Sequence, residues 1–279
     1  MAAAEKPWGN NVLVDFDDGI AWVRFNRPDK KNAMSPALNA EMRETVNALA
    51  TDDRCGVFVL TGEGDAFSAG MDLKEYFRET DNAPATTLMN VRRTAEEGHW
   101  RRLRDYPTPS IAMVNGWCFG GAFTPLVGCD LAIAADEAVF GLSEINWGIL
   151  PAGNVTKAVI ETMGYRDALY YTMTGNNFDG KKAAQLGLVN ESVPLAQLRD
   201  HTRELAQLLL SKNQAALRNA KLAMKRVRHM DWDTSADYLY AKMAEALHLG
   251  AAENREKAMK AFLDDKEFKP GVQHFDGTK

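Results

Sequence analysis

Two short glycine-containing segments carry the residues of this chain that are best suited to chemistry. They are Ser68–Leu73, with the sequence SAGMDL, and Gly120–Thr124, with the sequence GGAFT. Each follows a β-branched, apolar run and opens into a helical pattern, so each leaves backbone N–H groups free at the start of a helix. Two such turns can direct two amides at one acyl oxygen, which is the arrangement of an oxyanion hole. Taken alone, either segment could also be only a tight turn.

A third segment, Phe140–Gly148, sets the carboxylate of Glu144 among apolar and aromatic neighbours. Such surroundings raise the pKa of a carboxyl group and suit it to proton transfer near neutral pH. The alternative is a solvated loop carboxylate. Two further motifs are incomplete. Gly62–Phe67 begins like a dinucleotide fingerprint but has a phenylalanine at the third glycine position, and Ala66–Gly70 resembles a nucleophile elbow without its first glycine. We therefore expect neither a dinucleotide site nor a serine hydrolase.

The composition is that of a globular protein with room for a large core. The 279 residues are 46% hydrophobic and 25% charged, and the net charge of −5 gives no overall attraction to nucleic acid or to an anionic membrane. Neither a signal-peptide pattern nor a run of transmembrane length is present, so we expect a cytoplasmic protein. Cys55, Cys118 and Cys129 lack C-x-x-C spacing and a nearby histidine pair, so we expect buried thiols and no metal site.

Strand and helix patterns alternate over the first two thirds of the chain. Val12–Phe16 and Ile20–Phe25 predict a hairpin around Asp17–Gly19, and Ser35 predicts the cap of a following helix. Further strands are expected over residues 56–60, 110–114 and 130–134. This alternation indicates an α/β sheet. After about residue 194 only helices are expected, over residues 195–210, 214–227, 232–249 and 252–262. We therefore expect an α/β core over residues 1–199 and a helical region over residues 200–279.

Four ordered motifs resemble the enoyl-CoA hydratase/isomerase (crotonase) superfamily. They are Asn26–Pro28 with Lys31–Ala33, Ser68–Leu73, Gly116–Gly121 and Phe140–Glu144, and the resemblance extends from about Val12 to Gly271. It implies the ββα spiral core of that family, a helical C-terminal trimerisation region, and homotrimers that often pair into hexamers. It also implies a coenzyme A thioester as substrate and no separate cofactor.

The resemblance also assigns catalytic roles to individual residues. It implies that the amides of the oxyanion hole are those of Met71 and Gly121, and that Glu144 transfers protons. Simple enoyl-CoA hydratases have a second glutamate at the position of Thr124. A threonine cannot act as a base near neutral pH, and it can only orient a water or a neighbouring group by hydrogen bonding. One carboxylate would then carry out every proton transfer.

Longer strings, among them Met71–Glu79 and Asp237–Lys242, resemble the subgroup of the superfamily that hydrates and cleaves 4-hydroxycinnamoyl-CoA thioesters. The resemblance implies hydration of feruloyl-CoA followed by retro-aldol cleavage to vanillin and acetyl-CoA. An enoyl-CoA hydratase or isomerase that does not cleave the carbon–carbon bond is the alternative. A scaffold that only binds RNA or partners is disfavoured by the acidic charge and by Glu144. Two departures from the subgroup, Thr124 for serine and Ala122 for glycine, bear on substrate fit and rate.

Binding residues are likewise implied by the resemblance. The substrate-binding set is Tyr76, Tyr240 and Trp147, in which the two tyrosines would hold the ring 4-hydroxyl. Because Tyr240 also lies on an apolar helical stripe, its alternative is a role in helix packing or at a subunit interface. The set implied for the coenzyme A moiety is Lys31, Ala69, Phe262 and Lys266. Each of these could otherwise be a surface or packing residue.

Overall fold

The computed structural model describes residues 8–267 and 269, and by their packing they divide into two units. The core unit contains the described residues up to Tyr106 together with Ser110–Arg203. The helical unit contains Pro107–Pro109 and the described residues from Glu204 onward. The expected division into two domains after residue 199 stays a prediction.

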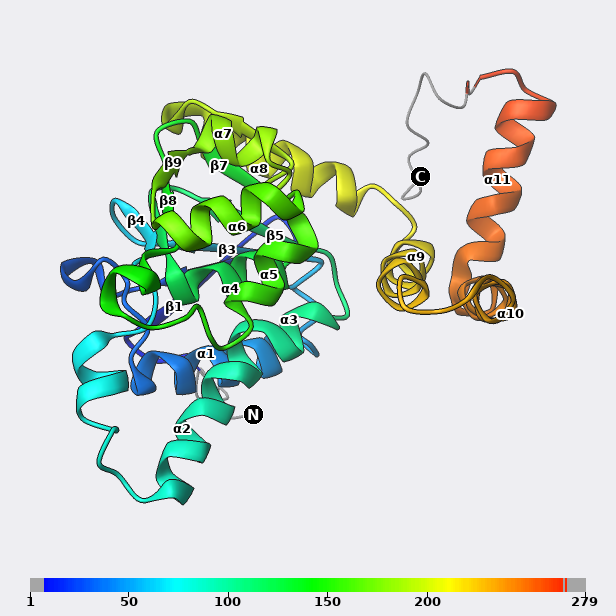
Figure 1. The fold of residues 1–279 in the computed structure, drawn as a ribbon. Coiled ribbons are helices and arrows are strands. Elements are labelled where there is room, and N and C mark those ends of the chain that lie inside the picture. The colour runs from blue at the N-terminus through cyan, green and yellow to red at the C-terminus, as the bar shows by residue number, and fades with distance from the viewer. Residues whose placement is uncertain (1–7, 268, 270–279) are drawn as a thin grey trace, which may run out of the picture. The chain divides into compact units, whose positions relative to one another are not determined.

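The main sheet of the core unit has six strands in the order β1-β2-β3-β5-β7-β10 (Figure 1). β1 (Val12–Asp17) and β2 (Ile20–Phe25) form the expected antiparallel hairpin, and the turn residues Asp18 and Gly19 have φ angles of 49° and 79°. The other neighbours pair in parallel, and the remaining strands are β3 (Val57–Gly62), β5 (Ser110–Val114), β7 (Leu131–Ala135) and β10 (Glu191–Val193). Every residue of β3 and β5 is buried, as in parallel sheets covered on both faces. The three strands expected after the hairpin are therefore confirmed, within two residues of their expected ends.

A second sheet of four short strands was not predicted from the sequence. Its strands are β4 (Ala66–Ser68), β6 (Trp117–Phe119), β8 (Val139–Gly141) and β9 (Asn177–Asp179), in that order. β4, β6 and β8 pair in parallel, whereas β9 is antiparallel to β8. Three residues are too few for a periodic pattern, so only pairing with distant segments defines these strands.

Some helices of the core unit begin at recognisable side-chain caps. The hydroxyl of Ser35 accepts a hydrogen bond from the Leu38 N–H (3.2 Å) at the start of α1 (Pro36–Leu49), as expected. The other α-helices are α2 (Ala85–Glu96), α3 (Arg102–Arg104), α4 (Phe123–Gly128), α5 (Val155–Thr162), α6 (Tyr165–Thr174) and α7 (Gly180–Gln185). Short 3₁₀ or π turns are η1 (Pro28–Lys30), η2 (Leu73–Arg78), η3 (Glu97–Arg101), η4 (Gly120–Ala122) and η5 (Ser143–Trp147).

The C-terminal helices follow the predicted bounds closely. α8 (Leu195–Leu210) and α9 (Gln214–Val227) have the expected limits. The prediction of a single helix over residues 232–249 is wrong in one respect. α10 (Trp232–Ala246) passes into the π turn η6 (Leu247–Ala251), where Gly250 has a φ of 112°, before α11 (Ala252–Leu263) begins. Within the helical unit α10 packs on α9, and η6 contacts both α9 and α11.

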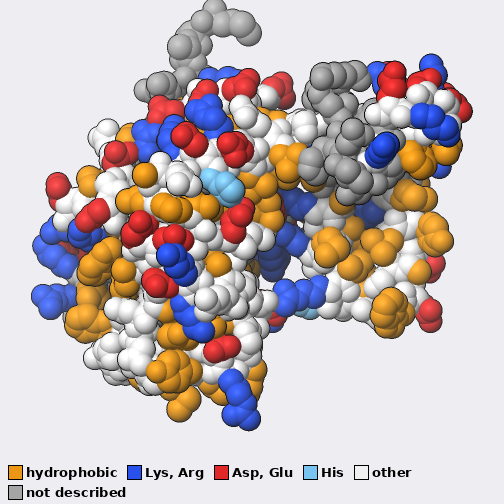
Figure 2. Space-filling model, turned by 90° about the horizontal axis from the view of Figure 1, so that it is seen from above, with side chains coloured by type: hydrophobic (Ala, Val, Ile, Leu, Met, Phe, Trp, Pro, Cys, Tyr) orange, Lys and Arg blue, Asp and Glu red, His pale blue; other side chains and the backbone are white. Residues whose placement is uncertain are grey.

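The surface carries mixed charges. On the face shown in Figure 2, acidic and basic side chains of the core unit are interspersed with one another and with hydrophobic side chains. Among the residues that the structure describes, every helix is too short or too polar to cross a bilayer.

Candidate active site

Three adjacent parallel strands lead into the three segments that the sequence singled out. β4 ends at Ser68, β6 ends directly before Gly120, and β8 ends two residues before Ser143, where η5 begins. Because β4, β6 and β8 are neighbours in the second sheet and run in the same direction, their carboxyl ends lie along one edge. The sheet therefore brings together residues that are far apart in the sequence.

The two glycine turns are in direct backbone contact. Gly70 has a φ of +88°, and a Cβ added to it would lie 2.6 Å from the Phe119 carbonyl oxygen and 3.1 Å from the Gly121 nitrogen. A side chain at this position would therefore be excluded both by backbone conformation and by space. The two turns are therefore built against each other, as an oxyanion hole made from both would require.

Two amides lie side by side at this contact. A Cβ added to Gly121 would lie 3.2 Å from the Met71 nitrogen. The Met34 backbone pairs with the residues on both sides of Met71. The Met34 N–H donates to the Gly70 carbonyl (2.8 Å), and the Asp72 N–H donates to the Met34 carbonyl (3.2 Å). Within the described residues, neither the Met71 N–H nor the Gly121 N–H donates a hydrogen bond. Both donors are therefore available to a ligand.

The motif around residues 26–33 is hydrogen-bonded to the first turn through Asn32. The Ser68 hydroxyl donates to the Asn32 carbonyl (2.8 Å) and accepts from the Gly70 N–H (3.1 Å), while the Asn32 side chain donates to the Ala66 carbonyl (2.7 Å). All of these side chains are fully buried. Their hydrogen bonds fix the backbone that leads to the Met71 amide.

Asp72 anchors the start of η2 and is paired with a cation. It accepts hydrogen bonds from the Lys74 and Glu75 N–H groups (3.0 and 2.9 Å), and its other oxygen lies 3.0 Å from the Arg27 guanidinium. Burial alone would raise the pKa of Asp72, but the hydrogen bonds from Glu75, Arg27 and Lys74 outweigh it and lower that pKa. Asp72 is therefore a structural carboxylate, and the sequence analysis gave Arg27 no role because its partner lies on a distant segment.

The carboxylate of Glu144 lies against the second turn. Gly120 has a φ of +49°, and a Cβ added to it would lie 2.7 Å from Glu144 Oε1 and 3.4 Å from Oε2. Oε2 is buried and accepts no hydrogen bond from a described residue. Burial raises the pKa of Glu144 above its ordinary value, and its own backbone N–H only partly opposes this. The geometry thus places a proton-accepting group beside the two amides.

Thr124 is bonded to the same turn. Its buried hydroxyl donates to the Gly121 carbonyl (2.8 Å), one helical turn back along the chain. The hydroxyl proton is therefore engaged within η4 and α4, although the oxygen can still accept a hydrogen bond. Ala122, the neighbouring departure from the subgroup pattern, is fully buried.

Two of the residues expected to bind substrate, Tyr76 and Trp147, lie close in sequence to Met71 and Glu144. Tyr76 is half-buried on η2, the helix that begins two residues after Met71. Burial raises the pKa of Tyr76. The charge of Arg92 lowers that pKa and the charge of Glu96 raises it, and the net shift is upward, so the hydroxyl keeps its proton at neutral pH. Trp147 ends η5, three residues after Glu144, and its side chain is 63% exposed.

Lys31 and Ala69 are brought together by the backbone. The Ala69 N–H donates to the Lys31 carbonyl (2.8 Å). The Lys31 ammonium forms an ion pair with Asp65 and lies 5.9 Å from the centre of the half-exposed Trp117 ring. A phosphate that binds Lys31 would therefore compete with Asp65.

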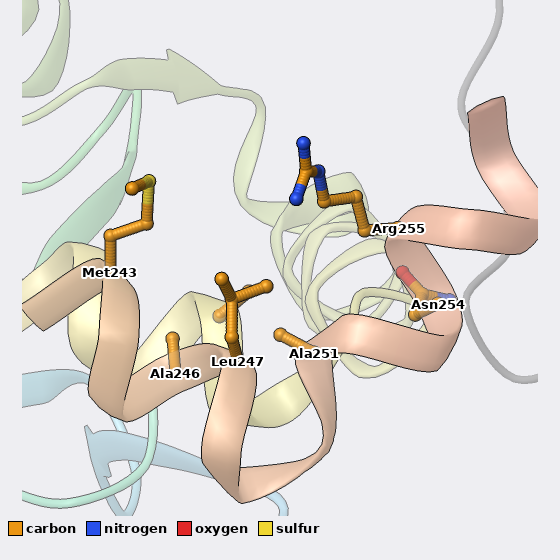
Figure 3. A pocket seen from close by; sticks show the side chains of 7 residues that line it. Met243, Ala246, Leu247, Ala251, Asn254 and Arg255 are labelled. Atoms are coloured by element: carbon orange, nitrogen blue, oxygen red, sulfur yellow. The ribbon is translucent and has the colours of Figure 1, made fainter.

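The other three expected binding residues belong to the helical unit. Tyr240 on α10 is 70% exposed and Phe262 on α11 is 44% exposed, while the Lys266 ammonium donates to the Leu263 carbonyl (2.5 Å). One turn after Tyr240, Met243 borders a hollow of about 240 Å³. Its lining, shown in Figure 3, is Ala216, Met243, Ala246, Leu247, Ala251, Asn254 and Arg255.

A buried polar pair near Met71 could not be predicted from the sequence. His99 and Asn39 are both fully buried, and His99 Nε2 lies 2.7 Å from Asn39 Oδ1. The Asn39 amide nitrogen faces the Met71 sulfur at 4.0 Å. Neither residue stands in a motif, so only the fold reveals their contact. Groups of acidic, cysteine and histidine side chains that could hold a metal ion do not occur among the described residues.

Comparison with known proteins gives consistent matches along the chain. A family described as enoyl-CoA hydratase/isomerase matches residues 15–271. Hydroxycinnamoyl-CoA hydratase-lyase of Pseudomonas fluorescens is 56% identical over 275 residues, which cover 99% of each chain. The 2,3-dehydroadipyl-CoA hydratase of Escherichia coli is 29% identical over 92% of this chain and 97% of its own. A crystal structure of an enoyl-CoA hydratase from Bacillus anthracis is 26% identical, with a TM-score of 0.82 over 96% of this chain and 99% of that one.

Proposed function

The chain belongs to the enoyl-CoA hydratase/isomerase family, which confirms the expected fold, and from this premise we propose that it hydrates and cleaves 4-hydroxycinnamoyl-CoA thioesters. The reaction adds water to the double bond of feruloyl-CoA and then breaks the bond between the α- and β-carbons, releasing vanillin and acetyl-CoA. The observation that carries the proposal is the half-buried Glu144, with its Oε2 atom buried, beside the free amides of Met71 and Gly121. The high identity to the hydratase-lyase supports cleavage over hydration or isomerisation alone.

The two amides would act on the thioester oxygen in both halves of the reaction. Addition of water at the β-carbon moves electrons onto that oxygen and forms an enolate. Cleavage of the hydrated thioester forms a second enolate, that of acetyl-CoA, on the same oxygen. Each preorganised donor of such a hole is worth about 3 kcal/mol of transition-state stabilisation. One pair of amides therefore serves both steps.

Glu144 would carry the protons through one closed cycle. As a carboxylate it takes a proton from the attacking water, and as a carboxylic acid it gives that proton to the α-carbon. It then removes the proton of the β-hydroxyl group, the carbon–carbon bond breaks, and the acid protonates the acetyl-CoA enolate. The carboxylate is restored at the end, so a single group suffices. Its raised pKa suits it to both roles.

Recognition of the aromatic ring would rest on Tyr76, Tyr240 and Trp147. A neutral Tyr76 hydroxyl can accept a hydrogen bond from the substrate 4-hydroxyl or donate one to its oxygen. With Tyr240 as the second partner, the pair would hold the phenol while its oxygen donates electrons through the ring to the thioester oxygen. This gives a quinone-methide-like species whose β-carbon accepts water. The exposed indole of Trp147, three residues after Glu144 on η5, would offer an apolar face to the ring.

Coenzyme A would enter as part of the substrate and not as a separate cofactor. We propose that Lys31, Ala69, Phe262 and Lys266 contact its nucleotide and pantetheine portions. We further propose that the chain forms a homotrimer or a dimer of trimers through its C-terminal helices, that it works in the cytoplasm, and that it has no nucleic-acid or membrane partner. The exposed Tyr240 and Phe262 support contacts through the C-terminal helices, and the net charge of −5 supports the absence of a nucleic-acid or membrane partner.

Incubation of the purified protein with feruloyl-CoA tests the proposal. We expect vanillin and acetyl-CoA in equal amounts by liquid chromatography and mass spectrometry. Accumulation of the hydrated thioester without aldehyde would show a hydratase that does not cleave, and an unchanged substrate would refute both steps. Crotonyl-CoA, which has no phenol, serves as the matched substrate, and we expect it to be hydrated slowly and not cleaved.

A further inference from the structure

The buried pair Asn39 and His99 lies next to the first turn of the hole, because the Asn39 side chain contacts the Met71 sulfur. Asn39 is on α1, and His99 is on the π turn η3. Their side chains meet at 2.7 Å, and both are almost completely buried. The proposed reaction uses neither of them, so their position needs another reason.

The hydrogen bond fixes the orientation of the Asn39 amide. Because Asn39 Oδ1 can only accept, His99 Nε2 must carry the hydrogen. Burial lowers the pKa of His99 to about 3, so the ring stays neutral over the working range of pH. With Oδ1 held in this way, the amide nitrogen faces the Met71 sulfur at 4.0 Å. The Met71 side chain in turn lies against the second turn, since its Cγ is 3.1 Å from a Cβ added to Gly121.

The π turn that carries His99 is packed against α1 and against α4, the helix that follows the second turn of the hole. A Cβ added to Gly98 would lie 3.0 Å from the Arg43 nitrogen and 3.3 Å from the Asn39 carbonyl oxygen, so η3 approaches α1 closely. A Cβ added to Gly128, at the end of α4, would lie 2.8 Å from the His99 carbonyl oxygen. α4 follows directly from the turn that holds Gly121. π turns of this kind often occur at functional sites.

We propose that Asn39, oriented by His99, is a positioning residue that holds the Met71 side chain against Gly121 and so keeps the two amides directed at one oxygen. The inference rests on the proposed role of these amides as the oxyanion hole. It does not depend on whether the bound thioester is afterwards cleaved.

Polarisation of a bound thioester gives a direct test. In a Glu144→Gln background, we expect 4-hydroxycinnamoyl-CoA to bind with negligible turnover, and hydrogen bonds to its carbonyl should shift its absorption to longer wavelength. We expect Asn39→Leu to reduce this shift by at least half while changing the dissociation constant less than threefold. In the active protein, the same change should lower kcat on the order of tenfold with KM nearly unchanged, because a misplaced donor acts mainly in the transition state.

Three further variants separate positioning from stability. Met71→Leu keeps the amide but removes the sulfur, so it should reduce the shift as Asn39→Leu does, and the double variant should be no worse than either. It also carries the test if Asn39→Leu does not fold. His99→Gln can still donate to Asn39 and should restore most of the shift that His99→Leu loses. Val46→Ala, buried on the same helix, should lower the melting temperature and leave the shift unchanged.

The outcomes are distinct from those for the proposed function. A full shift in Asn39→Leu, or an equal loss in Val46→Ala, would overturn the positioning role. If feruloyl-CoA yields no vanillin but Asn39→Leu still reduces the shift, the cleavage proposal fails and this inference stands.

Discussion

Replacement of Glu144 by glutamine is the most direct test of the proposed chemistry. Glutamine has the shape of glutamate, so it can occupy the space over Gly120, where Oε1 lies 2.7 Å from an added Cβ. It has no charge and no transferable proton at neutral pH. The substitution therefore removes proton transfer and leaves the amides of Met71 and Gly121 in place.

The expected loss follows from the number of steps that use this carboxylate. General acid–base catalysis contributes about 10²- to 10⁴-fold at a positioned group. Glu144 would serve four successive transfers, and Thr124, at the position of the family's second glutamate, has its hydroxyl proton engaged with the Gly121 carbonyl. We therefore expect a loss near the upper end of that range, about 10⁴-fold in kcat, which is about 5 kcal/mol of activation free energy. Thioester affinity should change less than about threefold, because the oxyanion hole and the remaining contacts are retained.

The assay measures release of vanillin from feruloyl-CoA by the variant and by the unchanged protein across pH. For the unchanged protein, kcat/KM should fall as pH falls through the pKa of Glu144, because the free enzyme must hold it as a carboxylate. Because burial raises the pKa of Glu144, this fall in kcat/KM should occur above pH 4.5, the ordinary pKa of a glutamate. A Glu144→Gln variant that keeps more than a tenth of normal turnover, or an acid limb that persists in its residual activity, would refute the assignment.

Glu144→Gln should lower activity but raise the stability of the protein at pH 8. A raised pKa means that the folded protein favours the protonated carboxyl group, so that contribution to stability is present below pH 4.5 and is lost as pH rises through the raised value. Glu144→Gln should therefore unfold at a higher urea concentration than the unchanged protein at pH 8, and the difference should shrink at pH 4. Equal midpoints at pH 8 would show that the folded site does not disfavour the charge.

Substitutions at three other positions test the surroundings of the site. Thr124→Val should lower the free energy of unfolding by about 1 kcal/mol through the lost bond to the Gly121 carbonyl, and Thr124→Ser should retain it. An activity loss in Thr124→Val as large as in Glu144→Gln would instead show that the hydroxyl acts on the substrate. Tyr76→Phe should lower kcat/KM about tenfold for feruloyl-CoA and much less for crotonyl-CoA, and equal losses would contradict phenol recognition. Gly120→Ala should abolish turnover in a protein that still folds, since its Cβ would collide with the Glu144 carboxylate at a φ of +49°, and normal activity would contradict the observed contact.

Local features were decided by the sequence. The Asp18–Gly19 turn, the cap at Ser35 and the limits of α8 and α9 follow from turn chemistry, capping and helical period, which act over a few residues. The glycines of the two turns and the apolar surroundings of Glu144 could also be read from the chain, so the components of the site were predictable. The resemblance to the family then supplied the role expected of each residue.

Only the tertiary structure decided how these components meet. The second sheet was invisible in the sequence because its strands are three residues long, yet its parallel order sets Met71, Gly121 and Glu144 along one edge. The hydrogen bond of Thr124, the burial of Glu144 Oε2 and the pair of Asn39 with His99 likewise depend on the path of the folded chain. Periodicity and capping report only on neighbours along the chain, whereas hydrogen bonding and desolvation depend on which distant segments pack together.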